Sequence, residues 1–286
     1  MSTSLGLAPF RVNDGHELPA MGLGTFGMRG EDGIAAIVSG LRNGYRLLDT
    51  AVGYDTEAEV GEAIRRSGVP ASEIVVTTKI RRTGHGYDAA RRSIERSRRT
   101  LGIDRIGLYL IHWPNPRLGK FVDTWRALVD ARSDGEVRSI GVSNFEEPHL
   151  EAIIDATGVV PAVDQIELHP HFPQAELRGL NASLGIRTES WSPLGLGRRA
   201  LLAEPSIASI ASEHDVSPAQ IVLRWHHQLG CLPVPRSSNA QRQAANLDIG
   251  GFALSEGEMV RIGELGRPDG PLYGRLWGGD SATEER

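Results

Sequence analysis

The first feature that limits the possible folds is a series of short apolar segments that each end in a titratable side chain. Residues 44–54 form a predicted buried strand that ends at Asp49 and continues through a loop to Tyr54. Two further apolar runs, 74–78 and 106–111, lead directly into Lys79 and His112. Because α/β barrels place their chemistry at the carboxyl ends of parallel strands, we expect these four side chains to meet there.

The four side chains form a set with a chemical logic. An unperturbed tyrosine hydroxyl has a pKa of about 10, and a neighbouring ammonium lowers that pKa by stabilising the phenolate. Asp49 would hold Lys79 in place, and His112 would orient a substrate oxygen. Each residue alone has a simpler structural explanation, such as a cap or a solvated strand end. Together they suit protonation of a carbonyl oxygen while a cofactor delivers hydride.

The rest of the chain continues the alternation of strand and helix. A β-hairpin is expected at 10–20, with Asp14-Gly15 as its turn. Eight strand–helix units follow without a change in composition, which predicts one α/β domain over residues 1–286, a (β/α)8 TIM barrel. The strands are expected at 21–25, 44–49, 74–79, 106–112, 137–142, 162–167, 186–191 and 232–234. The helices are expected at 31–43, 57–66, 88–101, 121–128, 147–156, 174–184 and 239–246, with two more helical segments between 192 and 230.

Composition excludes several classes of partner. The chain has 286 residues, of which 40% are hydrophobic and 23% charged, values that are typical of a globular core. A net charge of −5 gives no overall attraction to nucleic acid or anionic lipid. The single cysteine, Cys231, excludes an internal disulfide and fits a reducing compartment. With no signal peptide or membrane-spanning run visible, we expect a cytoplasmic protein. Because no exposed heptad or apolar patch is legible, we also expect a monomer.

Two local patterns favour ordinary structural explanations. The arginine-rich segment 91–99 lacks interleaved aromatic residues, which favours the exposed face of a helix over a nucleic-acid patch. His169 and His171 have no acidic or cysteine partner at the spacing that metal ligands require. We therefore expect neither nucleic-acid binding nor a metal site.

Several segments together resemble the aldo-keto reductase family. They are Leu48-Asp49-Thr50-Ala51 with Tyr54 and Glu57, Thr78-Lys79, Ile111-His112-Trp113-Pro114, Gly141-Val142-Ser143-Asn144-Phe145 and Trp191-Ser192-Pro193-Leu194-Gly195. The matches follow the family order from about Phe10 to Asn246 and cover most of the chain. Short loops make the chain similar to the prokaryotic branch that includes 2,5-diketo-gluconate reductases.

This resemblance implies an activity and a set of roles. The protein would reduce aldehydes or ketones with NADPH, with Tyr54 as general acid, Lys79 lowering its pKa, Asp49 holding Lys79 and His112 positioning the carbonyl. Candidate substrates are small polar carbonyls, such as keto-sugar acids or methylglyoxal. The resemblance also implies that the hairpin closes the bottom of the barrel and that residues 265–286 form a tail near the substrate site.

The resemblance places NADP(H) along the carboxyl ends of the later strands. Ser143, Asn144 and Gln165 would hold the nicotinamide carboxamide, and Trp191 would stack on the ring. The segment from Ser192 through Leu194 and Gly195 to Gly197 would cover the pyrophosphate. The 2′-phosphate and adenine would meet Arg236, Ser237, Ser238, Arg242 and Asn246, and Gly24 and Thr25 would also contact the cofactor.

The substrate would contact Phe26, Trp113, His112 and Trp277, with Tyr273 as a weaker candidate. The chain departs from the family pattern at three positions. Arg236 replaces the more common lysine and adds a bidentate phosphate ligand. Ala245 removes a polar group beside the adenine. Asp55 adds a negative charge near the mouth of the site, which could disfavour anionic substrates.

Two alternatives stay open at this point. Residues 22–27 match a Gly-x-Gly-x-x-Gly dinucleotide fingerprint with Asp49 about twenty residues later, as in a Rossmann-type NAD dehydrogenase. The preceding segment contains Pro19 and little β-branching, and no helix begins at the glycines, so the context disfavours this fold. The second alternative is a cofactor-binding sensor or structural subunit with little turnover, against which the intact set of four catalytic residues argues.

Overall fold

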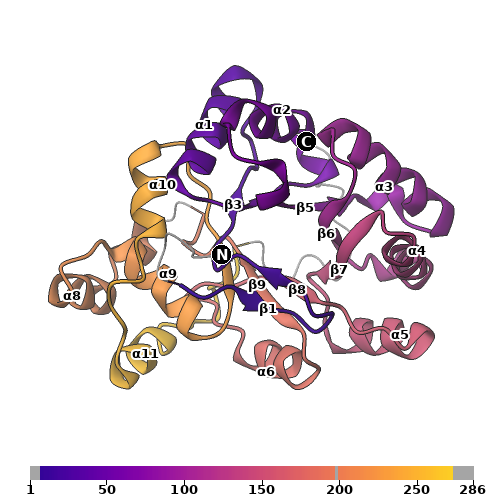
Figure 1. The fold of residues 1–286 in the computed structure, drawn as a ribbon. Coiled ribbons are helices and arrows are strands. Elements are labelled where there is room, and N and C mark those ends of the chain that lie inside the picture. The colour runs from indigo at the N-terminus through magenta and orange to yellow at the C-terminus, as the bar shows by residue number, and fades with distance from the viewer. Residues whose placement is uncertain (1–6, 197–198, 273–286) are drawn as a thin grey trace.

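The computed structural model describes residues 7–196 and 199–272, so Gly197, Tyr273 and Trp277 lie outside the described residues. Eight parallel strands form one sheet in sequential order, and helices surround it (Figure 1). The strands are β3 (Leu23–Gly24), β4 (Leu47–Asp49), β5 (Val75–Ile80), β6 (Ile106–Ile111), β7 (Val137–Ser143), β8 (Val163–Glu167), β9 (Arg187–Trp191) and β10 (Leu232–Val234). All eight overlap the predicted segments, and their bounds differ from the predicted ones by at most three residues.

Backbone hydrogen bonds close the sheet into a barrel. The amides of Gly22 and Gly24 donate to the carbonyls of Pro233 and Pro235, each over 3.0 Å, and so join the first barrel strand to the last. The protein is therefore the predicted (β/α)8 TIM barrel, and the Rossmann alternative is wrong. Gly22 and Gly24 serve barrel closure, and the first helix begins only at Gly30.

The helices are α1 (Gly30–Asn43), α2 (Glu57–Ser67), α3 (Tyr87–Leu101), α4 (Phe121–Ser133), α5 (Glu147–Thr157), α6 (Ala175–Ser183), α7 (Arg199–Leu202), α8 (Pro205–Glu213), α9 (Pro218–Gln228), α10 (Ala240–Leu247) and α11 (Glu256–Gly263). Short 3-10 turns are η1 (Val52–Tyr54), η2 (Ala71–Glu73), η3 (Arg82–Gly84) and η4 (Pro116–Leu118). No helix within the described ranges is long and apolar enough to cross a bilayer.

Local sequence explains where several helices begin and end. α1 ends at Gly44, whose φ of 115° is accessible to glycine and whose amide bonds to the carbonyls of Gly40 and Leu41. α9 begins with a capping box between Ser217 and Gln220, and Pro218 follows the cap as predicted. α11, which our sequence analysis missed, has the same signal in Ser255 and Glu258.

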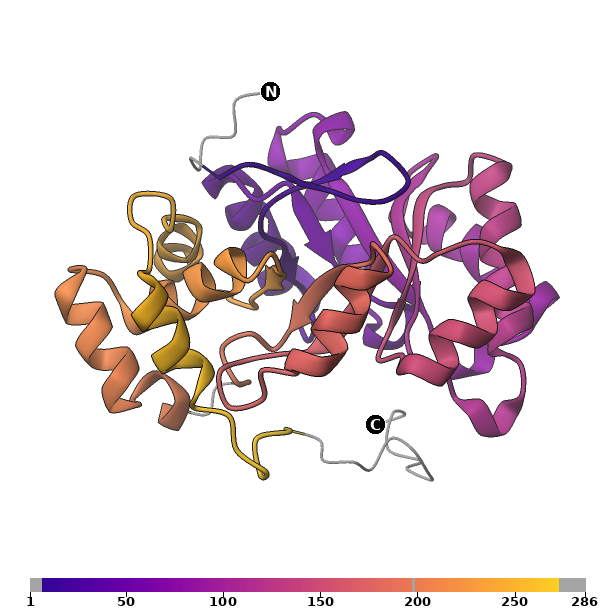
Figure 2. The ribbon, with the colours of Figure 1, turned by 90° about the horizontal axis from the view of Figure 1, so that it is seen from below.

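The N-terminal hairpin covers one end of the barrel. β1 (Phe10–Arg11) pairs antiparallel with β2 (Glu17–Leu18) around the predicted turn. Val12 and Leu18 are buried in one cluster with barrel residues that include Leu108 and Leu232. Figure 2 shows the hairpin, in indigo, at one end of the barrel and the yellow segment after α11 at the other.

The arginine-rich segment forms the outer face of α3, as predicted. Its inner positions, which include Ile94 and Leu101, are buried. Outer arginines form ion pairs, among them Arg91 with Asp134 at 2.8 Å and Arg99 with Glu95.

Two helical glycines, one in a crowded position and one in an open position, test how closely α2 packs against α3. A Cβ added at Gly61 in α2 would lie 2.3 Å from the carbonyl oxygen of Leu101, whereas one added at Gly179 in α6 would meet no atom within 4 Å. We expect Gly61→Ala to lower the free energy of unfolding by about 1–3 kcal/mol, because α2 must move away from α3. The control Gly179→Ala should raise it by about 0.5–1 kcal/mol through helix propensity. Urea denaturation measures both, and stabilisation by both substitutions would contradict the close packing.

Candidate active site

A buried ion pair occupies the carboxyl ends of β4 and β5. The Lys79 ammonium is fully buried and donates to both carboxylate oxygens of Asp49, each over 2.7 Å, and to the carbonyl of Thr50 over 3.0 Å. Burial alone would lower the pKa of Lys79, but attraction to Asp49 and to the phenolate form of Tyr54 outweighs it and raises that pKa. Lys79 therefore carries its charge inside the barrel.

Tyr54 lies beside this pair at the end of η1. The ammonium of Lys79 is 5.1 Å from the centre of the Tyr54 ring. The rings of His112 and Phe26 meet the Tyr54 ring edge-on, with centroids 5.7 Å and 5.1 Å away. The structure thus brings all four predicted catalytic side chains together, with Phe26 next to the phenol.

His112 is held as a neutral imidazole. Burial, followed by the nearby charge of Lys79, lowers the pKa of His112 to about 3. Its backbone carbonyl accepts a hydrogen bond of 3.1 Å from the Asn144 side chain, which ties the end of β6 to the end of β7. A neutral imidazole can share a hydrogen bond with a substrate oxygen without adding a charge to the site.

The predicted carboxamide site lies across the ends of β7, β8 and β9. Ser143 donates to the backbone carbonyl of Gln165 over 2.7 Å. The Trp191 indole donates to the Asn144 side-chain oxygen over 2.9 Å, which fixes the ring orientation. Asn144 adopts a left-handed φ of 60°, so the chain turns sharply where β7 ends. Ser143, Asn144, Gln165 and Trp191 therefore form one connected group.

Gln165 joins this group to the ion pair and to a residue that sequence analysis missed. Its side-chain nitrogen donates to Asp49 and to Glu189, each over 2.8 Å. Glu189 is fully buried on β9. The available signal was the two-residue strand period, which puts Glu189 on the same face as Trp191.

The loop after β9 is built for tight turns. Ser192 has a left-handed φ of 50°, and its carbonyl accepts a 2.9 Å hydrogen bond from the amide of Gly195. Leu194 packs against two of the core clusters. This anchoring leaves the exposed Leu196 at the surface of the loop.

The predicted phosphate residues follow β10. Arg236 and Arg242 are exposed, and within the described ranges neither forms an ion pair. The Arg236 guanidinium donates to the Phe26 carbonyl over 2.6 Å, which directs it toward the loop after β3. Ser237 is buried, whereas Ser238 is exposed. Two cations and an exposed hydroxyl are thus available at one corner of the barrel's carboxyl end.

Other predicted contacts have internal partners in the structure. Asn246 is buried, as is the neighbouring Tyr45. Thr25 is also buried, and its hydroxyl donates to the Asp49 carbonyl over 2.9 Å. Gly24 is buried, and a Cβ there would lie 3.5 Å from the Val234 carbonyl oxygen. These three residues therefore shape the walls of the site from within.

At the mouth of the site, Phe26 is 58% exposed, and Trp113 is partly buried. Asp55 adopts a left-handed φ of 51° and lies 3.6 Å from Arg29, which also donates to the Tyr54 carbonyl over 3.1 Å. Because Arg29 offsets the charge of Asp55, the repulsion of anionic substrates considered above is weakened.

His169 and His171 have acidic partners after all, which corrects our sequence analysis. His169 contacts Glu167 at 3.1 Å, and His171 contacts Glu204 at 2.7 Å. Arg267 donates to the other ring nitrogen of His171 over 2.9 Å. Residues 7–196 and 199–272 contain no group of three or more histidine, cysteine or acidic side chains that could hold a metal. His171 instead helps to fasten the segment after α11 to the barrel through Arg267.

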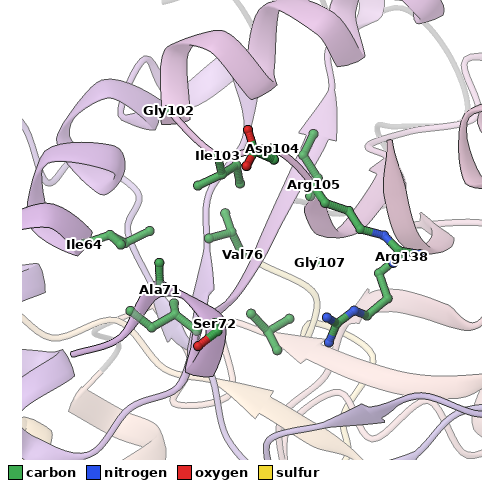
Figure 3. Close-up of a pocket in the computed structure, with 13 residues that line it drawn as sticks. Ile64, Ala71, Ser72, Val76, Gly102, Ile103, Asp104, Arg105, Gly107 and Arg138 are labelled. Carbon is green, nitrogen blue, oxygen red and sulfur yellow. The ribbon is translucent and has the colours of Figure 1, made fainter. Parts of the chain in front are cut away.

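A cavity of about 330 Å³ lies at the end of the barrel opposite the candidate active site. Its walls come from the first residues of β5 and β6, with Ile64 and Ile103 nearby. Arg105 and Arg138 lie along one side of it (Figure 3). Because Lys79 and His112 lie at the other ends of these strands, the cavity is separate from the candidate active site.

Fold and site together define a (β/α)8 barrel with a buried lysine–aspartate pair beside a tyrosine and a neutral histidine. The model of the Aldo/keto reductase family matches residues 20–267. The chain belongs to the aldo/keto reductase family. It is an NADP-dependent oxidoreductase that acts on carbonyl compounds, as our sequence analysis predicted.

Several relatives are similar over nearly their whole length. 2,5-Diketo-D-gluconic acid reductase B of Corynebacterium sp. (strain SHS752001) is 52% identical and covers 96% of this chain and 96% of its own. Morphine 6-dehydrogenase of Pseudomonas putida is 44% identical, over 89% and 90%. The crystal structure of a Gox0644 mutant in complex with NADPH has a TM-score of 0.88 at 44% identity, over 93% and 96%.

Removing one partner tests the buried pair. We expect Asp49→Asn to lower the free energy of unfolding by about 3–5 kcal/mol, because it removes the carboxylate in direct contact with the buried Lys79 ammonium. Glu95→Gln, which removes an exposed carboxylate paired with Arg99, should cost less than about 1 kcal/mol. Urea denaturation at pH 7 compares the two, and equal losses would argue against the pair as a main determinant of stability.

Proposed function

We propose that the protein reduces small polar aldehydes and ketones to alcohols with NADPH, and that Tyr54 is the general acid. The observation that supports this most strongly is the fully buried Lys79, whose ammonium lies between Asp49 and the Tyr54 ring. A fixed cation next to a phenol stabilises the phenolate, so the phenol gives up its proton more readily near neutral pH.

The exposed donors and the tight turns at the carboxyl end of the barrel fit NADPH. Arg236 and Arg242 would bind the 2′-phosphate together with Ser238, and a guanidinium suits this because it donates two parallel hydrogen bonds. The turn at Ser192–Gly195 would approach the pyrophosphate, and Trp191 would stack on the nicotinamide. When bound, NADPH supplies the hydride.

The roles of the remaining residues follow from their contacts. Neutral His112 would donate a hydrogen bond to the substrate carbonyl and orient it toward the Tyr54 hydroxyl. Asp49 would hold the Lys79 ammonium in place. After transfer of its proton, the Tyr54 phenolate would be stabilised by Lys79 until solvent restores the proton. Phe26 and Trp113 would form the apolar walls around the carbonyl.

The substrate class is proposed from similarity and from the site. The relative with 52% identity is named for the reduction of a keto-sugar acid. Arg29 offsets the charge of Asp55 at the mouth, so the entrance does not present an isolated anion. We therefore propose keto-sugar acids and other small polar carbonyls, such as methylglyoxal, as substrates.

The first test removes only the phenolic hydroxyl. We expect Tyr54→Phe to reduce kcat for methylglyoxal by about 10²–10⁴-fold, because general acid catalysis contributes about that factor. NADPH binding, measured by fluorescence titration, should change little. Tyr87→Phe removes an exposed hydroxyl that bonds Asp130 between α3 and α4, and it should leave kcat unchanged. Equal activity of wild type and Tyr54→Phe would exclude the phenol as the acid.

A second test concerns the phosphate site. We expect Arg236→Ala to raise the KM for NADPH by about 10–100-fold, because it removes hydrogen bonds from a cation to a phosphate. The KM for NADH should not change, because NADH lacks the 2′-phosphate. Arg261→Ala, at an exposed position of α11, is the matched control. An equal rise in the KM for NADPH and for NADH would exclude Arg236 as a ligand of the 2′-phosphate.

The sensor alternative makes a different prediction for the same assays. A cofactor-binding subunit would bind NADPH tightly and consume it slowly with every carbonyl in a panel. Turnover that depends on Tyr54 distinguishes the reductase from such a subunit.

A further inference from the structure

Glu189 is a fully buried carboxyl group that the proposed mechanism does not use. It lies on β9 opposite Gln165 of β8 and Leu232 of β10. Ser190 and Thr188, which alternate with it, bond outward to His226 of α9 and Asn181 of α6. The strand period therefore directs Glu189 into the barrel interior, toward the ion pair.

One amide group connects Glu189 to the catalytic residues. The Gln165 side-chain nitrogen donates to Glu189 and to Asp49, each over 2.8 Å. A side-chain amide has two N–H donors, and these two contacts use both. The side-chain carbonyl oxygen of Gln165 then remains for a ligand, so Gln165 would accept a hydrogen bond from that ligand.

The charges around Glu189 do not balance if every group is ionised. Asp49 on β4 and Lys79 on β5 face Glu189 across the interior, with Tyr54 beyond them, and β10 contributes only the apolar Leu232. Two carboxylates and one ammonium would leave a net charge of −1 in a dry interior. One proton on the pair of carboxyl groups removes that charge, and buried groups adopt such neutral states.

The Asp49 carboxylate is committed to Lys79, so the proton belongs on Glu189. Burial, followed by repulsion from Asp49, raises the pKa of Glu189 to about 8. Its second oxygen, Oε2, is buried without a hydrogen-bond partner among the described residues. A bare carboxylate oxygen there would be more costly than a neutral carboxyl group.

We propose that Glu189 is a positioning residue, which orients the Gln165 amide and carries the proton that keeps its cluster with Asp49 and Lys79 neutral. The proposal rests on the reductase function. With Glu189 neutral, Lys79 exerts its full effect on Tyr54, and Gln165 offers its carbonyl oxygen to the amide of the nicotinamide. When Glu189 loses its proton, a second carboxylate competes for Lys79, and Tyr54 becomes a weaker acid.

The first test detects the proton on Glu189 through the pH dependence of stability, without an activity assay. Between pH 4.5 and 8 the folded protein holds a proton on Glu189 that the unfolded chain releases, so this residue makes stability fall as pH rises across that range. Glu189→Gln, which imitates the neutral carboxyl group, lacks this loss. We expect its urea midpoint to fall less than that of the wild type from pH 5 to pH 8.

The exposed Glu95→Gln variant should follow the wild type in this experiment. Parallel pH dependences of wild type and Glu189→Gln would overturn the proposal. Because unfolding does not require a substrate, a difference here stands even if no carbonyl is reduced, which separates this inference from the proposed function.

The second test uses binding and rate. Glu189→Gln can still accept the hydrogen bond from Gln165, whereas Glu189→Leu cannot. We expect the Kd for NADPH to rise about tenfold in Glu189→Leu, as for one lost hydrogen bond, and to stay near the wild-type value in Glu189→Gln. The fall in reductase kcat above about pH 8 should move to higher pH in Glu189→Gln. Identical pH profiles of kcat in the wild type and Glu189→Gln, or equal Kd values in Glu189→Gln and Glu189→Leu, would overturn the proposal. If Glu189→Leu does not fold, the pH profiles of the wild type and Glu189→Gln still decide.

Discussion

The ion pair between Lys79 and Asp49 is the interaction on which the rest of the site depends. An ammonium inside a barrel is several kcal/mol less stable than in water unless a counter-charge and hydrogen bonds surround it. Asp49 and the Thr50 carbonyl meet this requirement. Neighbouring hydroxyls hold Asp49 and Thr50 in place. The Thr25 hydroxyl donates to the Asp49 carbonyl, and the Thr50 and Thr56 hydroxyls share a hydrogen bond of 2.9 Å.

This pair divides the barrel into two functional halves. Below it, the interior is mainly apolar, and the hairpin contributes Val12 and Leu18 to a cluster with Leu47 and Leu110. Above it, the strands end in polar side chains that bond one another from β4 to β9. The hydride-transfer chemistry we propose needs a dry, rigid base and an open upper face, and the packing of the lower half supplies that base.

Contacts outside the barrel proper extend the upper half. The segment after α11 reaches the carboxyl end of the barrel, where Arg267 bonds His171 and the Leu272 amide bonds Glu167. A Cβ at Gly270 would lie 1.9 Å from the His171 carbonyl oxygen, so the chain passes very close to this point. The end of the described chain is therefore held beside the site by specific polar contacts.

The sequence by itself determined the barrel and the four residues at its centre. Strand and helix periods are local, so the position of Lys79 or His112 at a strand end follows from a few neighbouring residues. The tertiary structure decided what those residues touch. Gln165 meets Asp49, 116 positions earlier, only because the barrel closes, and Glu189 faces Lys79 for the same reason. Glu204 pairs with His171 because the segments that follow the neighbouring strands β8 and β9 meet. The burial of Asn246 and the internal hydrogen bond of Thr25 also escaped prediction, because a polar side chain near a predicted site can face either a ligand or the core. Periodicity fixes the face of a strand, whereas contacts across the interior depend on closure, which no local pattern encodes.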